Sequence, residues 1–385
     1  MASNGNMNVL IHGFSIGSGG GYTVAREVLR NIALVRPNWT ITISLTSGYK
    51  LHEEMRTEGL PDNCDFFWGP ENLRGNLARR KYERSEYVSW AATKNFDANI
   101  QLNGMLIPGL NIPTLAHYQD PMPYRSIAWQ GQKDRLIAFF KRRENKVALH
   151  QAAACGFTSN YLKDLICGHH KHTPKRCEVF YNGIPHEWIE RADAGLPEWS
   201  SRPLDIATIS NVAPYKQQEM VIRAMPHLIK HPGLEELKYR IIGQCDDAYR
   251  QHLEQVSKEL GVSNNIVLEG RVSDERVQEV FSSSRAYVLM SLCESFGIPA
   301  IEAMSFGTPV VTSNCCAMPE VCGQAAELSD VDNVEELAGR IQRILTDDAH
   351  AEQMRTAGVQ QMKRFDWMAT GKQMAERLED IVPGH

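Results

Sequence analysis

No apolar run in the sequence approaches the ~20 residues that a membrane-spanning helix needs. The N-terminal stretch MASNGNMNVLIHGF lacks the basic residues of a secretory signal and runs directly into an apolar, strand-like segment. The nine cysteines form no paired framework, and their odd number leaves at least one thiol unpaired, as in a reducing compartment. These absences predict a cytoplasmic protein with at most peripheral contact with the inner face of a membrane.

A positive net charge is also missing, since 41 Lys and Arg residues stand against 46 Asp and Glu residues. This balance argues against a nucleic-acid-binding protein. The charge is unevenly distributed: residues 1–180 hold 22 basic and 15 acidic side chains, which leaves 19 and 31 for residues 181–385. A basic first half suits a phosphorylated ligand or an anionic membrane surface, although unevenly spread solvated side chains explain any single cluster equally well.

The sequence does contain a regular alternation of short, apolar, strand-like runs with longer amphipathic segments. NVLIHGF (8–14), LDIATIS (204–210) and AYVLMS (286–291) are such runs, and each is followed by a helical pattern. Continuous apolar strands separated by helices are typical of parallel sheets that are covered on both faces. The sequence therefore predicts an α/β protein with two doubly wound, Rossmann-like parallel-sheet domains.

A polar segment interrupts this alternation near the middle of the chain. HEWIERADAGLPEWSSRP (186–203) is rich in Pro, Gly, Ser and charge, as linkers are. We expect one domain over residues 1–190, a second over 200–365, and a terminal helix over 366–385 that packs back on the first domain. Open parallel sheets bind ligands beyond the carboxyl ends of their strands, so the active site is expected in the cleft across which the domains face each other.

The stretch CESFGIPAIEAM (293–304) places two glutamates around an apolar, glycine-containing turn. Pro299 is suited to the first turn of a helix that ends at Gly307, with Glu294 in the preceding loop and Glu302 in the helix. The backbone amides of residues 295–298 then lie near a helix N-terminus, where an anion binds readily. Two carboxylates beside such a site can hold a phosphorylated, polyhydroxylated molecule. A helix cap and a glutamate that stabilises the helix dipole explain the pattern equally well.

The longer stretch SLCESFGIPAIEAMSFGTPVV resembles the signature of family 4 glycosyltransferases, which are retaining enzymes of the GT-B fold. That signature is Glu, seven residues, Glu, a helix of small residues and Gly-Thr-Pro-Val-Val. Supporting motifs follow in the family's order: GGGYTVAREVL, YNGI (181–184), LEGRVSDERVQEVFSSSRAYVLM, MPEVCGQAAEL and FDWMATGKQM. The resemblance implies acceptor binding by the N-terminal domain and nucleotide-sugar binding by the C-terminal domain.

The resemblance also implies a role for individual positions of this sequence. Glu294 would hold hydroxyls of the donor sugar, and Glu302 the ribose of the nucleotide. The amides of the loop between them would contact the sugar and the diphosphate, namely those of Ser295, Phe296, Gly297 and Ile298. In the first domain, Gly20 and Gly21 would allow a phosphate of the donor to approach the backbone. His117 would be a catalytic histidine near the attacking hydroxyl. Arg271 and Val272 would meet the base through main-chain atoms.

One position departs from the family pattern. The family typically has Arg and Lys on the diphosphate, whereas ISNVAPYKQQE supplies Asn211 in place of the Arg and keeps Lys216. An asparagine side chain can donate a hydrogen bond to a phosphate but adds no charge, so either another cation contributes or the donor is held more weakly. No Asp-x-Asp follows a strand in the second half, so we expect no metal and no cofactor, and we expect Lys216 to stabilise the leaving diphosphate.

Four other stretches have competing interpretations. CGHHKHTPKRC (167–177) lacks a recognised metal-ligand spacing, which favours a polar surface loop. Cys315 and Cys316 suit buried thiols better than a redox centre, and Asp246 and Asp247 suit a helix cap better than a metal site. KDRLIAFFKRRENKVAL (133–149) fits an interfacial helix, but a core-packed helix with a basic solvent face is favoured.

The sequence thus predicts a retaining, metal-independent glycosyltransferase of the kind used in polysaccharide biosynthesis. It would move a sugar from a nucleotide-diphosphate sugar to a hydroxyl of a glycan, a lipid-linked molecule or a small molecule. A nucleotide-sugar epimerase, a sugar phosphorylase and a non-catalytic nucleotide-sugar-binding subunit remain as alternatives.

Overall fold

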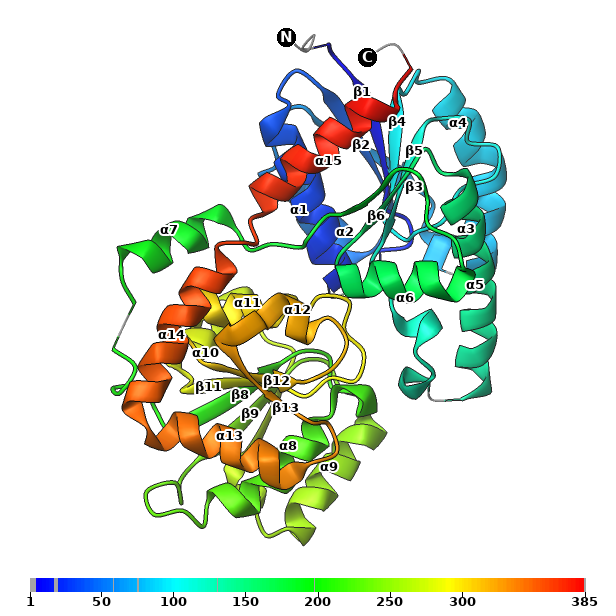
Figure 1. The fold of residues 1–385 in the computed structure, drawn as a ribbon. Coiled ribbons are helices and arrows are strands. Elements are labelled where there is room, and N and C mark those ends of the chain that lie inside the picture. Colours follow the sequence, from blue (N-terminus) through cyan, green and yellow to red (C-terminus); the bar gives the residue numbers. More distant parts are fainter. Residues whose placement is uncertain are drawn as a thin grey trace. The chain divides into compact units, whose positions relative to one another are not determined.

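The computed structural model describes residues 5–16, 20–57, 59–74, 76–129, 131–196 and 198–383. The chain divides into two compact units (Figure 1). The first consists of Met1–Tyr124, Gln130–Asn182 and Trp367–His385, and the second of Arg125–Trp129 and Gly183–Asp366. Each unit contains a parallel sheet with helices packed on it, which confirms the prediction of two doubly wound α/β domains. Among the described residues, no helix is both long enough and apolar enough to cross a membrane.

The first unit is built on a seven-stranded sheet in the order β3-β2-β1-β4-β5-β6-β7. Its strands pair in parallel, and Val9 of β1 lies opposite Ile41 of β2 on one side and Ala98 of β4 on the other. The strands are β1 (Asn8–His12), β2 (Thr40–Thr46), β3 (Cys64–Gly69), β4 (Ala98–Gln101), β5 (Thr114–Tyr118), β6 (Ala154–Phe157) and β7 (Cys177–Val179). The order reverses between β1 and β4, where doubly wound sheets bind ligands.

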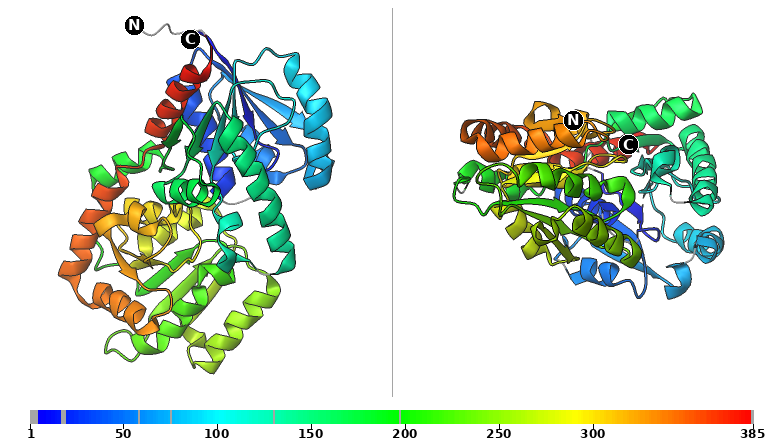
Figure 2. Two further views of the ribbon diagram at one scale, coloured as in Figure 1. Left: turned by 45° about the vertical axis from the view of Figure 1, so that its right-hand side comes forward. Right: turned by 90° about the horizontal axis from the view of Figure 1, so that it is seen from below.

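The helices of the first unit come from both ends of the chain. They are α1 (Gly20–Val35), α2 (Lys50–Thr57), α3 (Asn76–Tyr82), α4 (Val88–Ala92), α5 (Gln132–Gln151), α6 (Asn160–His170) and α15 (Trp367–Ile381). Helix α15 lies along α1 (Figures 1 and 2). Gly371 makes this approach possible, because a Cβ there would stand 2.7 Å from the Cβ of Asn31. Arg36 and Glu379 form an ion pair of 2.8 Å across the same contact.

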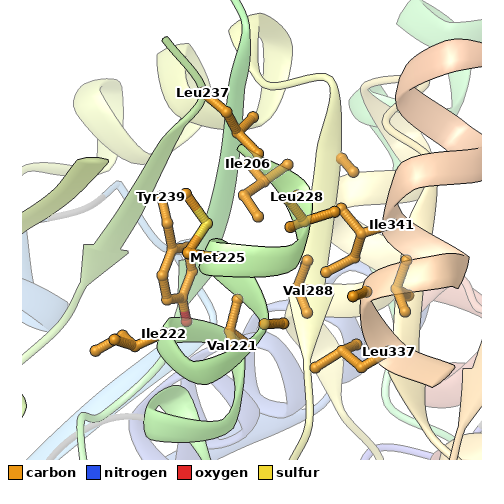
Figure 3. Packing of buried hydrophobic residues seen from close by; sticks show 14 of the residues in the cluster. Ile206, Val221, Ile222, Met225, Leu228, Leu237, Tyr239, Val288, Leu337 and Ile341 are labelled. Atoms are coloured by element: carbon orange, nitrogen blue, oxygen red, sulfur yellow. The ribbon is translucent and has the colours of Figure 1, made fainter. Parts of the chain in front are cut away.

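The second unit is built on a six-stranded parallel sheet in the order β10-β9-β8-β11-β12-β13. The strands are β8 (Asp205–Ile209), β9 (Lys238–Ile242), β10 (Ile266–Gly270), β11 (Ala286–Leu289), β12 (Val310–Ser313) and β13 (Ala326–Ser329). The helices are α7 (His186–Ala194), α8 (Gln218–Leu228), α9 (Asp247–Glu259), α10 (Asp274–Ser283), α11 (Ile298–Ser305), α12 (Met318–Cys322), α13 (Val334–Thr346) and α14 (Asp348–Met362). Figure 3 shows side chains of α8 and α13, among them Met225 and Ile341, packed against those of the strands, such as Val288.

The segment expected to be a linker is partly helical. Residues 186–194 form α7, because one side of this polar sequence can pack on the second unit: the Trp188 ring meets Phe306 edge-on at 5.1 Å. Arg191 also stacks over Phe306, with its guanidinium carbon 3.9 Å from the ring centre. The helix ends at Gly195, whose φ of 122° suits a residue without a side chain.

Three of the smaller predictions have different outcomes. Asp246 caps α9 as predicted, since its side chain accepts a hydrogen bond of 3.0 Å from the amide of Ala248. The vicinal cysteines are free thiols, but they are half-buried and not buried as predicted. The prediction of a surface loop around the histidine cluster is wrong for His169 and His170, which form the last turn of α6. His170 is held there by a contact of 2.9 Å with the hydroxyl of Tyr124.

Candidate functional site

The loop after β11 carries Glu294 to the N-terminus of α11. The predicted helix is confirmed: it spans Ile298–Ser305, has Pro299 in its first turn, and is followed by Gly307 with φ of 62°. Gly297 caps it with φ of 87°, and a Cβ at Gly297 would stand 2.6 Å from the sulfur of Met318. The tight turn therefore requires glycine, and it leaves the amides that follow it directed toward the loop.

Glu294 is paired with the lysine that sequence analysis assigned to the diphosphate. Lys216 lies in the 3₁₀ turn Pro214–Lys216 after β8, and its Nζ is 2.5 Å from Oε1 of Glu294. The two side chains are 14% and 12% exposed. Burial opposes the positive charge of Lys216, yet the adjacent Glu294 carboxylate raises the pKa of the ammonium above its ordinary value. Without a ligand, each charge thus compensates the other.

A buried tyrosine lies within range of the charges of both glutamates of the motif. Tyr287 of β11 is 1% exposed, and its hydroxyl donates a hydrogen bond of 3.1 Å to the carbonyl of Ile209. Burial raises the pKa of this phenol well above its ordinary value, and the charges of Glu294 and Glu302 raise it further. The neutral phenol thus links β11 to the last residue of β8. Sequence analysis placed this tyrosine in a strand-like run and did not predict that the charges of both carboxylates act on it.

A second cation near the loop was also missed. Arg125 belongs to the short segment Arg125–Trp129 that is part of the second unit, and its Nη2 donates a hydrogen bond of 3.2 Å to the carbonyl of Leu292. The neighbouring Cys316 and burial raise the pKa of the Cys315 thiol, and the charge of Arg125 offsets a small part of this rise. Since 167 residues separate Arg125 from Leu292, no local sequence pattern could indicate this contact.

The other predicted donor-binding positions of the second unit follow neighbouring strands. Asn211 follows β8 and is exposed, and its carbonyl accepts a hydrogen bond of 3.0 Å from the Gln218 amide. Arg271 follows β10 and is exposed, whereas Val272 is half-buried against Ile242 and Val280. Because the strands are parallel, these residues share the carboxyl edge of the sheet with Lys216 and Glu294.

The remaining predicted positions belong to the first unit. His117 is the fourth residue of β5 and is 1% exposed, and burial lowers its pKa to about 3, so the imidazole is neutral at pH 7. Gly20 and Gly21 begin α1, where an added Cβ would meet no described heavy atom within 4 Å. Within the described ranges, no cluster of three or more His, Cys, Asp or Glu residues could hold a metal ion.

Comparison with known proteins shows that most of the second unit is similar to a known protein family. Residues 196–361 match the family described as glycosyl transferases group 1. O-antigen chain mannosyltransferase B of Escherichia coli is 39% identical over 98 residues, which is 26% of each chain. A D-inositol 3-phosphate glycosyltransferase of Segniliparus rotundus is 24% identical over 335 residues, covering 83% of this chain and 71% of that one. The match thus spans about a quarter of the first relative and about seven-tenths of the second.

The likeness extends to the whole chain when structures are compared. HepE of Anabaena, solved in complex with UDP and glucose, superimposes with a TM-score of 0.75 at 18% identity. The match covers 97% of this chain and 100% of that one. The fold is GT-B. Together with the family match to residues 196–361, the fold supports a GT-B glycosyltransferase. The Lys216–Glu294 pair and α11 lie within these matched residues.

Proposed function

We propose that the chain is a retaining glycosyltransferase of the family 4 type, which moves a sugar from a nucleotide-diphosphate sugar to a hydroxyl acceptor. The observation that carries the proposal is the Lys216–Glu294 ion pair beside the N-terminus of α11. A cation, a carboxylate and the N-terminal amides of a helix at the carboxyl edge of a parallel sheet match the needs of a sugar diphosphate.

The pair has a different role in each state. Without donor, Glu294 holds the Lys216 ammonium in place and keeps it protonated. When the donor binds, its diphosphate replaces Glu294 as the ion-pair partner of the Lys216 ammonium. Glu294 is then available to accept hydrogen bonds from sugar hydroxyls. Because the cation is already positioned, little reorganisation is needed when charge develops on the leaving group.

The proposed reaction uses Lys216, Glu294 and the N-terminus of α11 together. The bond between the anomeric carbon and the diphosphate oxygen breaks, and the acceptor oxygen bonds to the same face of the sugar. The acceptor proton passes to the departing phosphate, and the neutral His117 is assigned to the vicinity of the attacking hydroxyl. Lys216, Arg125 and the amides of residues 296–298 stabilise the nucleoside diphosphate that leaves.

The donor is the first property to test. HepE was solved with UDP and glucose, and other relatives bear the names of a mannosyltransferase and an inositol-phosphate glycosyltransferase. A thermal-shift panel of UDP, GDP, ADP and dTDP identifies the nucleotide, and assays with the corresponding sugar donors then follow transfer and anomeric configuration by NMR. Full activity in excess chelator is expected, since Lys216 supplies the charge. Inverted product, transfer to free phosphate or interconversion of the sugar without an acceptor would overturn the proposal.

A further inference from the structure

Helix α5 of the first unit carries its large apolar side chains on the outside. The exposed fractions are 59% for Leu136, 46% for Phe139, 47% for Phe140 and 47% for Val147. These positions recur at spacings of three, four and seven residues, so they share one side of the helix. They form the apolar stripe of α5.

The opposite side of α5 is fixed to the unit. Ala138, Asn145, Ala148 and Leu149 are buried there. Asn145 donates a hydrogen bond of 2.7 Å from Nδ2 to the carbonyl of Gly104, and its Oδ1 accepts one of 3.1 Å from the hydroxyl of Tyr124. Its own carbonyl accepts a third, of 3.0 Å, from the hydroxyl of Tyr118. These bonds prevent α5 from rotating, so the apolar stripe stays outside.

Basic side chains flank the apolar stripe. The sequence of α5 contains six basic residues, Lys133, Arg135, Lys141, Arg142, Arg143 and Lys146, and two acidic ones. The Arg143 guanidinium lies 5.8 Å from the ring centre of Phe139, next to the stripe. Helix α3 lies beside α5 (Figure 1), joined to it by an ion pair of 2.7 Å between Arg80 and Glu144. It adds Leu77, which is 85% exposed, and the exposed basic residue Lys81.

The apolar stripe and the basic side chains that flank it together indicate which kind of partner fits this surface. A second copy of this surface would bring like charges together around the stripe, which disfavours self-association. A nucleic acid would match the charge but would leave the aliphatic side chains without a role. An anionic bilayer surface matches both features, because its acyl boundary accepts apolar side chains and its headgroups attract Lys and Arg.

We propose that α5, with the adjoining α3, is a docking surface for anionic lipid bilayers. Leu136, Phe139, Phe140 and Val147 enter the interface between headgroups and acyl chains, and the flanking basic side chains contact the phosphates. The interpretation favoured from sequence, a core-packed helix with a basic solvent face, describes the buried side correctly but does not account for the exposed apolar stripe. The proposal does not depend on the reaction assigned to the chain.

Vesicle sedimentation of the whole protein tests the proposal. The vesicles contain phosphatidylglycerol and phosphatidylcholine, or phosphatidylcholine alone, and salt is varied from about 0.05 to 0.5 M. We expect at least tenfold stronger partitioning to the anionic vesicles at low salt, falling as salt rises. Phe139→Ser/Phe140→Ser should weaken partitioning at least tenfold, and Lys133→Glu/Arg143→Glu should abolish its salt dependence.

A matched control is the variant Leu34→Ser on α1 of the same unit, because Leu34 is also 47% exposed but lies outside the apolar stripe. It should bind vesicles like the wild type. All variants alter exposed positions, so unchanged melting temperatures verify folding. Equal partitioning of the Phe139→Ser/Phe140→Ser variant and the wild type would overturn the proposal. So would a concentration-dependent dimer, detected by light scattering, that the same variant abolishes.

Discussion

Lys216 and Glu294 each supply the charge that allows the other to be buried. Removing one leaves the second without its partner, whereas replacing both by neutral side chains removes the problem. Substitutions at this one ion pair can therefore distinguish its contribution to the stability of the fold from its contribution to turnover.

Lys216→Ala should lower turnover about 10²–10³-fold, because a fixed donor to the leaving group is lost. It should also destabilise the fold by up to about 3 kcal/mol, since Glu294 is left uncompensated. Lys216→Met/Glu294→Gln should recover stability but not turnover, and Lys258→Ala on the exposed side of α9 serves as the control. Wild-type turnover in Lys216→Ala would contradict the role given to this cation.

The raised pKa of Lys216 also predicts a pH dependence. The ammonium is protonated in folded and unfolded chains below its ordinary pKa, so the pair contributes fully from neutral pH up to about 10. Its contribution is lost only as the pH rises through the folded value. The stability difference between the wild type and Lys216→Met/Glu294→Gln should therefore stay constant from pH 6 to 9 in urea titrations. A change within that range would contradict the raised pKa.

His117 predicts the opposite pH dependence, because burial holds its pKa near 3 rather than above 6. Between these values the unfolded chain binds a proton that the folded chain does not, so stability falls as the pH is lowered below about 6.5. The slope is at most about 1.4 kcal/mol per pH unit. His117→Gln should lose less stability on acidification than the wild type, whereas the exposed control His150→Gln should behave like the wild type.

In the proposed site, Arg125 supplies the positive charge that the family's arginine would supply at position 211. Arg125→Gln should weaken binding of the preferred nucleoside diphosphate about tenfold or more, since a charged hydrogen bond is worth ~1.5–3 kcal/mol. Asn211→Arg alone should be tolerated, and in the Arg125→Gln background it should restore part of the affinity. Calorimetric titration measures each step, with Arg84→Gln of the first unit as the control. No rescue would mean that the two positions do not share a ligand.

At the scale of elements, α11 depends on the turn that precedes it. Gly297→Ala should destabilise the protein by about 1–3 kcal/mol, because φ of 87° is strained for alanine and its Cβ would meet Met318. Gly339→Ala in α13 is the matched control: no heavy atom lies within 4 Å of an added Cβ, and alanine favours the helix. Equal melting temperatures for the two variants would show that the turn adapts without cost.

Element type was easier to predict from sequence than the direction in which an element faces. Pro299 and Gly307 mark the ends of α11 by local chemistry, and apolar runs indicated the strands, so these features could be predicted. Helix α5 shows the limit: periodicity placed Leu136 and Phe140 on one side, but it does not say which side is buried. Here the small Ala138 and Ala148 face the unit. The contacts of Glu294 with Lys216 and of Arg125 with Leu292 join distant segments, which no local pattern encodes.

At the scale of the whole molecule, α15 ties the end of the chain to its beginning. Gly371→Leu should force α15 away from α1, because even a Cβ would stand 2.7 Å from Asn31. The variant should unfold in two separate calorimetric transitions, with that of the first unit at lower temperature. Limited proteolysis should then cut near residue 367 first. A single, unshifted transition would mean that α15 adds little to the stability of the first unit.

The assignment of α15 to the first unit also has a consequence for synthesis. The long segment of the second unit, Gly183–Asp366, is translated before α15, although α15 covers a helix that was made first. The covered side of α1, which ends at Val35, therefore has no partner until the ribosome has passed residue 366 and made α15. A nascent chain that stops short of Trp367 thus leaves the side of α1 around Asn31 uncovered, where chaperones and other nascent chains can reach it. The first unit can therefore complete its fold only after α15 has been made.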